Sequence, residues 1–153
     1  MALADGYIGT AETKYHYNFW RPVTAIHLGD SDGNPDTAGD PSWTPSLGFT
    51  YPFPDHDSGH AVQGGAAAEV LRLFFGNDHI RFNACSLTLP AGSTCTDASP
   101  RLRSYSSLSE AANENALSRI LIGIHFRRAV EEGIEHGRKI ARRAFNIFLK
   151  PMH

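Results

Sequence analysis

The stretch FPDHDSGHAVQGGAAAEVLRLFF, residues 53–75, decides the fold of this chain. It starts with a compact polar group and continues into an apolar run without proline, which predicts a helix from Ser58 to Phe75. Asp57 or Ser58 is the expected N-cap. Because the first N–H groups of a helix have no partner within it, we expect this helix to present an anion site at its N-terminus.

Residues 118–127, SRILIGIHFR, place a second polar group near a helix end. Arg119 and His125 are six positions apart, which corresponds to about 120° around an unbroken helix. Their side chains can reach one ligand only if the helix ends between them. We therefore expect a break at Gly123 and a last helix from about Arg128 to Leu149.

Residues 14–22, KYHYNFWRP, form a third group. A short helix is predicted over residues 11–20, and Lys14 and Arg21, seven positions apart, are expected on one helical face. Pro22 disfavours helical geometry at the residue before it, so the helix should end there. A second short helix is expected from Pro22 to Leu28.

The rest of the chain is less regular. Residues 29–54 are rich in Gly, Pro, Asp, Ser and Thr, and a loop of this length usually lies over a site. Residues 77–103 are expected to be irregular, with a short β-hairpin around residues 90–92. Residues 107–110 form a capping box that begins the helix carrying residues 118–121. The expected architecture is an all-α bundle with long loops.

The bulk properties limit the class of protein. A length of 153 residues fits one domain over residues 1–153. A net charge of −2 gives no reason to expect nucleic-acid binding, and the arginines at 127–128, 138 and 142–143 are interpreted as a solvated helix face. No membrane span is expected, because the apolar run 61–75 is shorter than the roughly 20 residues required.

The two cysteines, Cys85 and Cys95, allow two interpretations. A disulfide between them would close a short surface loop, and that bond would favour a secreted or periplasmic location. Two free thiols are the alternative. The N-terminus lacks the cationic and apolar regions of a signal peptide.

The three polar groups together supply the donors that an oxyanion requires. They offer three permanent cations, two imidazoles, a hydroxyl and a glycine N–H. Such a set suits phosphate or vanadate, whether tetrahedral or trigonal-bipyramidal. The contributing residues are Lys14, Arg21, Ser58, Gly59, His60, Arg119 and His125.

These groups resemble the signature K-x6-RP, PSGH and SR-x5-H of one superfamily. It joins vanadium-dependent haloperoxidases to type 2 phosphatidic acid phosphatases and bacterial acid phosphatases. The Phe-Trp-Arg-Pro run, the Asp-Gly-Asn-Pro loop and the Trp-Thr-Pro segment resemble the haloperoxidase branch most. The resemblance extends from about Tyr7 to Phe145. It implies a helical bundle of this type, equivalent to the C-terminal, site-bearing half of longer haloperoxidases.

The resemblance also implies roles. Lys14, Arg21, Ser58, Gly59, Arg119 and His125 would bind vanadate, and phosphate or sulfate can occupy the same site. His125 would ligate the vanadium of a haloperoxidase or act as the nucleophile of a phosphatase. His60 would be the general acid–base, and Lys14 would polarise bound peroxide or a phosphoryl oxygen. The substrates would be hydrogen peroxide and halide, or a phosphomonoester.

Two residues depart from the family pattern. Asp57 replaces the usual proline. Ala129 replaces an aspartate that many members carry four residues after the last histidine and that orients it, which weakens the phosphatase interpretation. Two other roles stay open at this point. His56 either tunes a halide pocket beside His60 or faces solvent, and Phe53 either walls that pocket or belongs to the core.

Three functional hypotheses follow. The leading one is a vanadium-dependent haloperoxidase, and the second is an acid phosphatase that uses the same pocket. The third is a catalytically silent oxyanion-binding or assembly domain. In that last case a second copy of the chain or an N-terminal half would cover the apolar helix faces.

Overall fold

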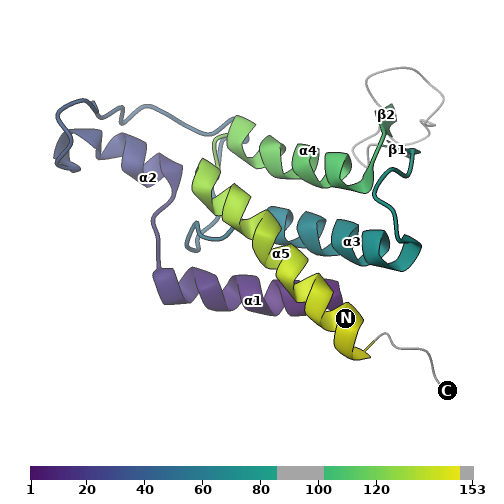
Figure 1. Cartoon of the computed structure of the whole chain (residues 1–153). Helices are drawn as coiled ribbons and strands as arrows, with labels where there is room; N and C mark the ends of the chain where they lie inside the picture. The colour runs from purple at the N-terminus through teal and green to yellow at the C-terminus, as the bar shows by residue number, and fades with distance from the viewer. Residues whose placement is uncertain (86–101, 149–153) are drawn as a thin grey trace.

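The computed structural model describes residues 1–85 and 102–148 (Figure 1). Four long helices form a bundle, which confirms the predicted fold class; they are α1 (Ala2–Tyr17), α3 (Gly59–Phe75), α4 (Leu108–Leu121) and α5 (Arg127–Phe148). A short helix, a 3-10 turn and two strands complete the described chain; they are α2 (Pro22–His27), η1 (Gly29–Ser31), β1 (Phe82–Cys85) and β2 (Leu102–Tyr105).

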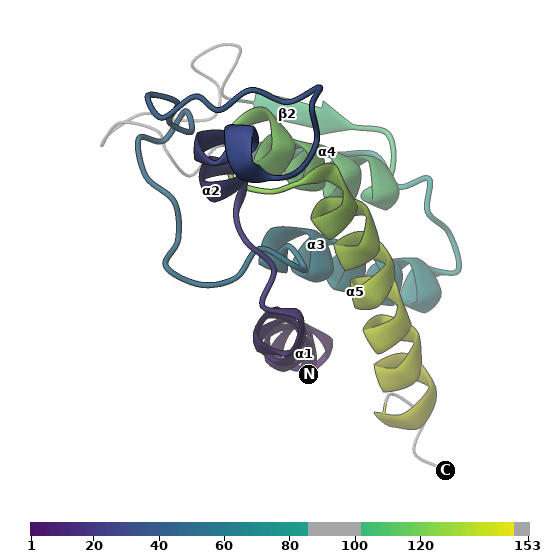
Figure 2. The ribbon, with the colours of Figure 1, turned by 90° about the vertical axis from the view of Figure 1, so that its left-hand side faces the viewer.

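Helix α3 is the centre of the bundle. It contacts α1, α4 and α5, and α5 crosses it diagonally (Figures 1 and 2). Glycines permit this close crossing, because a Cβ on Gly65 would collide with the carbonyl of Ile134. A Cβ on Gly137 would likewise collide with the carbonyl of Val62. Gly65 of α3 and Gly137 of α5 therefore lie at the interface between these two helices.

Helix α1 is longer at its start and shorter at its end than predicted. Asn18 adopts a left-handed conformation with φ 46° and ends the helix after Tyr17. Arg21 follows in extended backbone as the N-cap of α2. The expectation that Lys14 and Arg21 share one helical face was therefore wrong, whereas the short helix beginning at Pro22 is confirmed.

The break before His125 is confirmed. Helix α4 ends at Leu121, and Gly123 has a φ of 77°. The ring of Trp43 packs on this glycine, since a Cβ there would lie 2.8 Å from the Trp43 ring. Only glycine fits both the backbone conformation and the contact. His125 consequently lies in the turn between α4 and α5 rather than on either helix.

The strands form a two-stranded antiparallel sheet that pairs Phe82 with Tyr105 and Cys85 with Leu102. The predicted hairpin turn at 90–92 lies outside the described residues. Cys85 is disulfide-bonded, and Cys95 is also outside the described residues.

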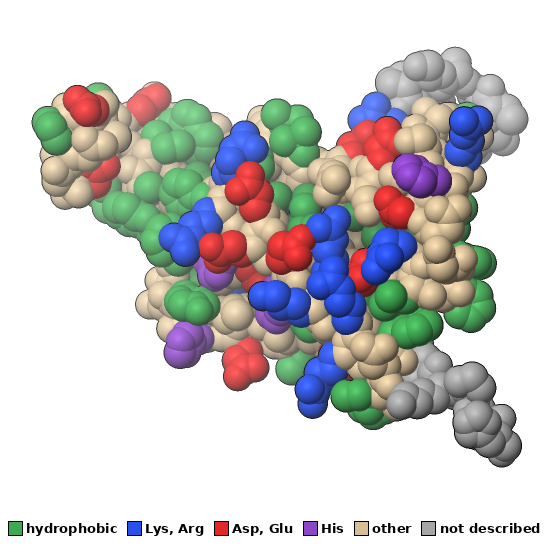
Figure 3. Space-filling model, viewed as in Figure 1, with side chains coloured by type: hydrophobic (Ala, Val, Ile, Leu, Met, Phe, Trp, Pro, Cys, Tyr) green, Lys and Arg blue, Asp and Glu red, His purple; other side chains and the backbone are tan. Residues whose placement is uncertain are grey.

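The surface of α5 carries charges of both signs (Figure 3). Arg128 Nε lies 2.7 Å from Glu132 Oε1, and Arg142 Nε lies 2.7 Å from Glu69 Oε1. Arg138 pairs with Glu135. Interspersed charges of this kind are a solvated face rather than a track for phosphates. Within residues 1–85 and 102–148, no helix has the length and apolarity that crossing a bilayer requires.

Candidate oxyanion site

A cavity of about 350 Å³ lies between α1, the start of α3 and the end of α4. Five of the seven predicted site residues line it, namely Lys14, Gly59, His60, Arg119 and His125. Aromatic side chains form much of the remaining wall, namely Tyr7, Tyr15, Tyr51 and Phe53. Phe53 is thus part of this cavity and not of the core. Arg21 and Ser58 are buried and do not line the cavity.

Lys14 reaches the cavity from the buried side of α1. Its Nζ donates hydrogen bonds to the carbonyls of Pro54 at 2.9 Å and Asp55 at 2.8 Å. An ammonium has three donors, so one remains for a ligand. Burial, followed by the charge of Arg21, lowers the pKa of Lys14 to about 8, with Asp55 and Asp57 opposing the shift.

Arg21 uses most of its N–H groups on the protein. Nε donates to Phe53 O at 3.0 Å, and Nη1 donates to Ile124 O at 2.9 Å. Nη2 donates to Pro54 O at 3.3 Å. These bonds tie the loop before α3 to the turn after α4. Nη1 also lies 3.4 Å from His125 Nε2, so Arg21 brings positive charge to that nitrogen.

His125 is held by a carboxylate. Its Nδ1 lies 2.6 Å from Asp55 Oδ1, and both side chains are buried. Contact with a carboxylate places a proton on Nδ1 and leaves the lone pair of the neutral ring on Nε2. Burial lowers the pKa of His125, while Asp55 raises it and the cations of Arg21 and Lys14 lower it.

Asp55 was not among the residues predicted from the sequence. Ala129 suggested that the carboxylate orienting His125 is lost, whereas Asp55 Oδ1 lies 2.6 Å from His125 Nδ1. One signal was available: an acidic residue stands three positions before Ser58, inside the second polar group. Nothing in the spacing showed that its side chain turns toward a residue in the third group.

Apart from Asp55 Oδ1 and His125 Nδ1, which contact each other at 2.6 Å, three buried polar atoms at the site have no hydrogen-bond partner among the described residues. They are Thr10 Oγ1, Ser58 Oγ and Arg119 Nε. Ser58 is the N-cap of α3, yet its side chain makes no capping bond, while its N–H donates to Ala129 O at 2.9 Å. Leaving buried donors unpaired costs roughly 1–3 kcal/mol each. An oxyanion with several acceptor oxygens fits such a donor set.

His60 lies on the exposed side of the same cavity. Its carbonyl accepts a hydrogen bond of 2.8 Å from Asn115 Nδ2, which ties the first turn of α3 to α4. Partial burial lowers the pKa of His60, and the positive charges of Arg119 and His125 lower it further. The neutral imidazole is therefore the dominant form near neutral pH, and it can accept a proton.

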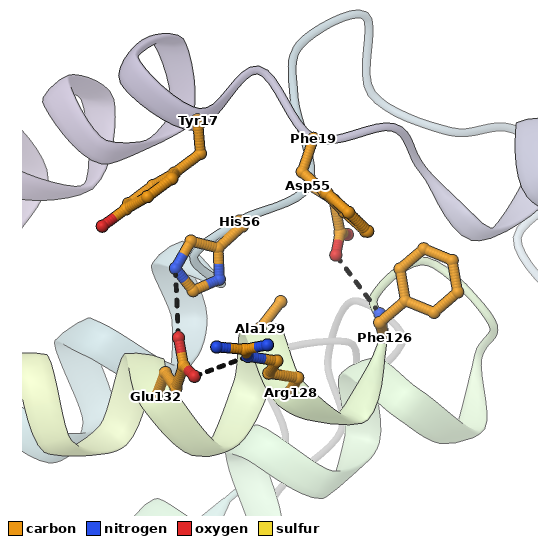
Figure 4. A pocket seen from close by; sticks show the side chains of 8 residues that line it. All are labelled: Tyr17, Phe19, Asp55, His56, Phe126, Arg128, Ala129 and Glu132. Atoms are coloured by element: carbon orange, nitrogen blue, oxygen red, sulfur yellow. Dashed lines mark hydrogen bonds and ion pairs between the residues drawn. The ribbon is translucent and has the colours of Figure 1, made fainter.

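His56 lies in a different cavity, of about 400 Å³ (Figure 4). Its Nε2 is 3.3 Å from Glu132 Oε2, and the ring of Tyr17 meets it edge to face. It neither joins His60 nor faces open solvent, so neither expected role fits. Asp55 also lines this second cavity and so stands between the two.

Asp57, in place of the usual proline, forms a second carboxylate–imidazole pair, in which the carboxylate is buried and the imidazole is partly exposed. Its Oδ2 is 2.6 Å from His136 Nδ1, and its Oδ1 accepts a hydrogen bond of 3.1 Å from Thr13 Oγ1. Thr13 is on α1 and His136 is on α5. Asp57 thereby joins both helices to the loop that carries Ser58.

The fold and the three polar groups place the chain in the superfamily that includes vanadium-dependent haloperoxidases and type 2 phosphatidic acid phosphatases. More narrowly, the chain belongs to the family described as the VCPO second helical-bundle domain, whose model matches residues 1–153.

Individual relatives agree with this family. Vanadium chloroperoxidase of Curvularia inaequalis is 29% identical over 163 residues, covering 83% of this chain and 26% of that protein. The crystal structure of the first bacterial vanadium-dependent iodoperoxidase matches with a TM-score of 0.74 and 36% identity, over 95% of this chain and 31% of that one. A holo-type bacterial vanadium-dependent chloroperoxidase shares the fold, with a TM-score of 0.71 and 22% identity over 95% and 33% of the two chains. The chain thus spans about a quarter to a third of the length of these relatives.

Proposed function

We propose that this chain is the vanadate-binding bundle of a vanadium-dependent haloperoxidase, which oxidises halide with hydrogen peroxide. The observation that supports this most is the buried contact between Asp55 and His125. It leaves Nε2 of His125 as the unprotonated nitrogen beside a cavity lined by Lys14 and Arg119. A neutral imidazole nitrogen among cations suits a site that binds a metal oxyanion.

The residues present fit vanadate. Lys14 and Arg119 line the cavity and would offset its negative charge, and Arg21 would add its charge through its contact with His125. The Gly59 N–H and the unpaired Ser58 Oγ would donate to its oxygens, and His125 Nε2 would be the ligand atom. Bound vanadate supplies a Lewis acid that activates peroxide without a change in oxidation state.

His60 and Lys14 complete the chemistry. His60, neutral near pH 7, accepts a proton from hydrogen peroxide at one ring nitrogen and later returns it to the leaving oxygen. Two donors of Lys14 are held by carbonyls, and its third N–H would face the bound peroxide and stabilise negative charge that develops there. The aromatic wall that includes Tyr51 and Phe53 limits water at this point.

Halogenation of monochlorodimedone tests this function directly. The purified protein would be assayed with hydrogen peroxide and bromide or iodide, with and without added vanadate. We expect turnover that saturates with vanadate and is lost in His125→Ala. A folded protein that binds vanadate yet shows no vanadate-dependent turnover with either halide would rule out the haloperoxidase proposal.

The acid phosphatase is the second candidate, and the Asp55–His125 contact favours it as well. A nucleophilic histidine needs a carboxylate on its other nitrogen, and Asp55 provides one despite Ala129. His125 Nε2 would attack the phosphoryl group, and His60 would protonate the leaving alcohol. Hydrolysis of p-nitrophenyl phosphate that vanadate inhibits, together with a trapped phosphohistidine, would establish this activity.

A protein that binds phosphate or vanadate but catalyses neither reaction would instead be an oxyanion-binding or assembly domain. Large apolar side chains on the surface are in keeping with a covering partner, for example Tyr7, Ile8 and Phe74, each more than 60% exposed. A second copy of the chain or a preceding helical half would cover them. Light scattering after size-exclusion chromatography distinguishes a dimer from a monomer.

A further inference from the structure

Asp55 is fixed in place independently of His125. Its backbone N–H donates to Phe19 O at 2.8 Å, and its carbonyl accepts from Lys14 Nζ. Its Oδ2 accepts a long bond of 3.4 Å from the N–H of Phe126. The side chain has no exposed surface. A buried carboxylate on a backbone that is held at both its N–H and its carbonyl can impose an orientation on the imidazole that it contacts.

Asp55 lies closer to His125 than to any cation. Its Oδ1 is 2.6 Å from His125 Nδ1 but 3.8 Å from Arg21 Nη1. Arg21 donates mainly to the carbonyls of Phe53 and Ile124. A role for Asp55 only as the counter-ion of Arg21 would predict the opposite order of distances.

Position 129 approaches the same region from the opposite wall. Ala129, on the first turn of α5, and Asp55, in the loop before α3, both line the second cavity (Figure 4). Ala129 is the position at which the resembling family often carries the orienting aspartate. This chain therefore has no carboxylate at position 129 of α5, but it has the carboxylate of Asp55 from the loop before α3.

We infer that Asp55 is the positioning residue of His125: it holds the proton on Nδ1, keeps Nε2 free for the oxyanion, and takes over from the loop the role of the missing carboxylate at position 129. This inference rests on the proposed function, because it assigns the oxyanion to His125 Nε2. Asp55 itself lies outside the set of residues that line the cavity of Lys14 and Arg119, so it acts through the imidazole.

The direct test is the tautomer of His125, read from the ¹⁵N shifts of its ring nitrogens, without vanadate. In the wild-type protein we expect the neutral ring to carry its proton on Nδ1. Asp55→Ala should weaken this preference, leaving only the part that Arg21 Nη1 supports from its place 3.4 Å from Nε2, and the double variant Asp55→Ala/Ala129→Asp should restore it. Asp57→Asn is the control: it disturbs an equally short carboxylate–imidazole contact, on the partly exposed ring of His136, and should leave the His125 tautomer unchanged.

Binding of inorganic phosphate, measured by calorimetry, supplies a second readout. Asp55→Ala should weaken it by about 10- to 100-fold, as expected on loss of a group that orients a ligand residue. Asp55→Glu should keep most of the affinity, since it retains the carboxylate.

A wild-type His125 protonated on Nε2 in its neutral form would overturn the inference, even if no Asp55 variant folds. So would an Asp55→Ala protein with the wild-type tautomer and affinity. A folded double variant without the Nδ1 proton would refute the equivalence with position 129. The expected tautomer together with absent halogenation would reject the proposed function and leave the role of Asp55 in place.

Discussion

Asp57 Oδ2 lies 2.6 Å from His136 Nδ1, and this contact joins the loop before α3 to the middle of α5. Two positions earlier, Asp55 makes a contact of the same length to His125. One short loop thus places a carboxylate on each of two histidines. The first pair joins α5 to the loop before α3, whereas the second includes His125, which lines the cavity.

The first prediction concerns the contact between Asp57 and His136. His136→Gln should lower the free energy of unfolding by about 1–3 kcal/mol, because it leaves the buried carboxylate of Asp57 without its closest partner. Urea unfolding monitored by circular dichroism measures the change. Glu135→Gln, on the exposed side of the same helix, is the control and should change stability by less than about 0.5 kcal/mol. Equal effects of the two substitutions would mean that the pair is not structural.

Oxyanion affinity should fall as the pH rises through about 8. Lys14 has a pKa lowered to about 8, so the free protein loses this cation above that pH, and an anion must then bind without it. Sulfate is the suitable probe, since its own charge does not change in this range. Lys14→Met should bind sulfate weakly at pH 7 and show no step near pH 8. An undiminished affinity of the wild-type protein at pH 9.5 would show that Lys14 does not face the anion.

Glu69 should stabilise the fold in a pH-dependent manner. Hydrogen bonds from Arg72, and then from Arg142, lower its pKa to about 2. A lowered carboxyl pKa stabilises the folded state above the unfolded value of 4.5, and the effect is lost as the pH falls from there toward 2. Glu69→Gln should therefore cost about 2 kcal/mol at pH 7 and much less at pH 2.5. Urea unfolding of both proteins at pH 7 and pH 2.5 measures this difference. An equal loss of unfolding free energy at the two pH values would contradict the lowered pKa of Glu69.

The crossing of α3 and α5 should tolerate no added methyl group. Gly137→Ala would push a Cβ into the carbonyl of Val62 and to 2.8 Å from Ala66 N. We expect a loss of about 1–3 kcal/mol in the free energy of unfolding, from overpacking against backbone that cannot move away. Arg143→Ala, at an exposed position of α5, serves as the control. A neutral Gly137→Ala would show that the helices are farther apart than described.

Local patterns in the sequence predicted the helices and the break before His125, because caps, proline and glycine act over a few residues. They did not predict the end of α1, since the left-handed Asn18 shows no signal beyond its residue type. Arg21 was expected to hold the anion with free N–H groups, whereas it donates mainly to carbonyls of a loop and a turn that are distant in sequence. Asp55 was missed for the same reason: its partner, His125, comes near only once α3, α4 and α5 have packed.

A crystal structure of the protein soaked with orthovanadate would locate the oxyanion and its ligand atom together. We predict one vanadate in the cavity between Lys14 and Arg119, bonded to Nε2 of His125, with Nδ1 of His125 still in contact with Asp55. Vanadate bound elsewhere on the protein, or an imidazole of His125 turned so that Nδ1 faces the cavity, would contradict this prediction.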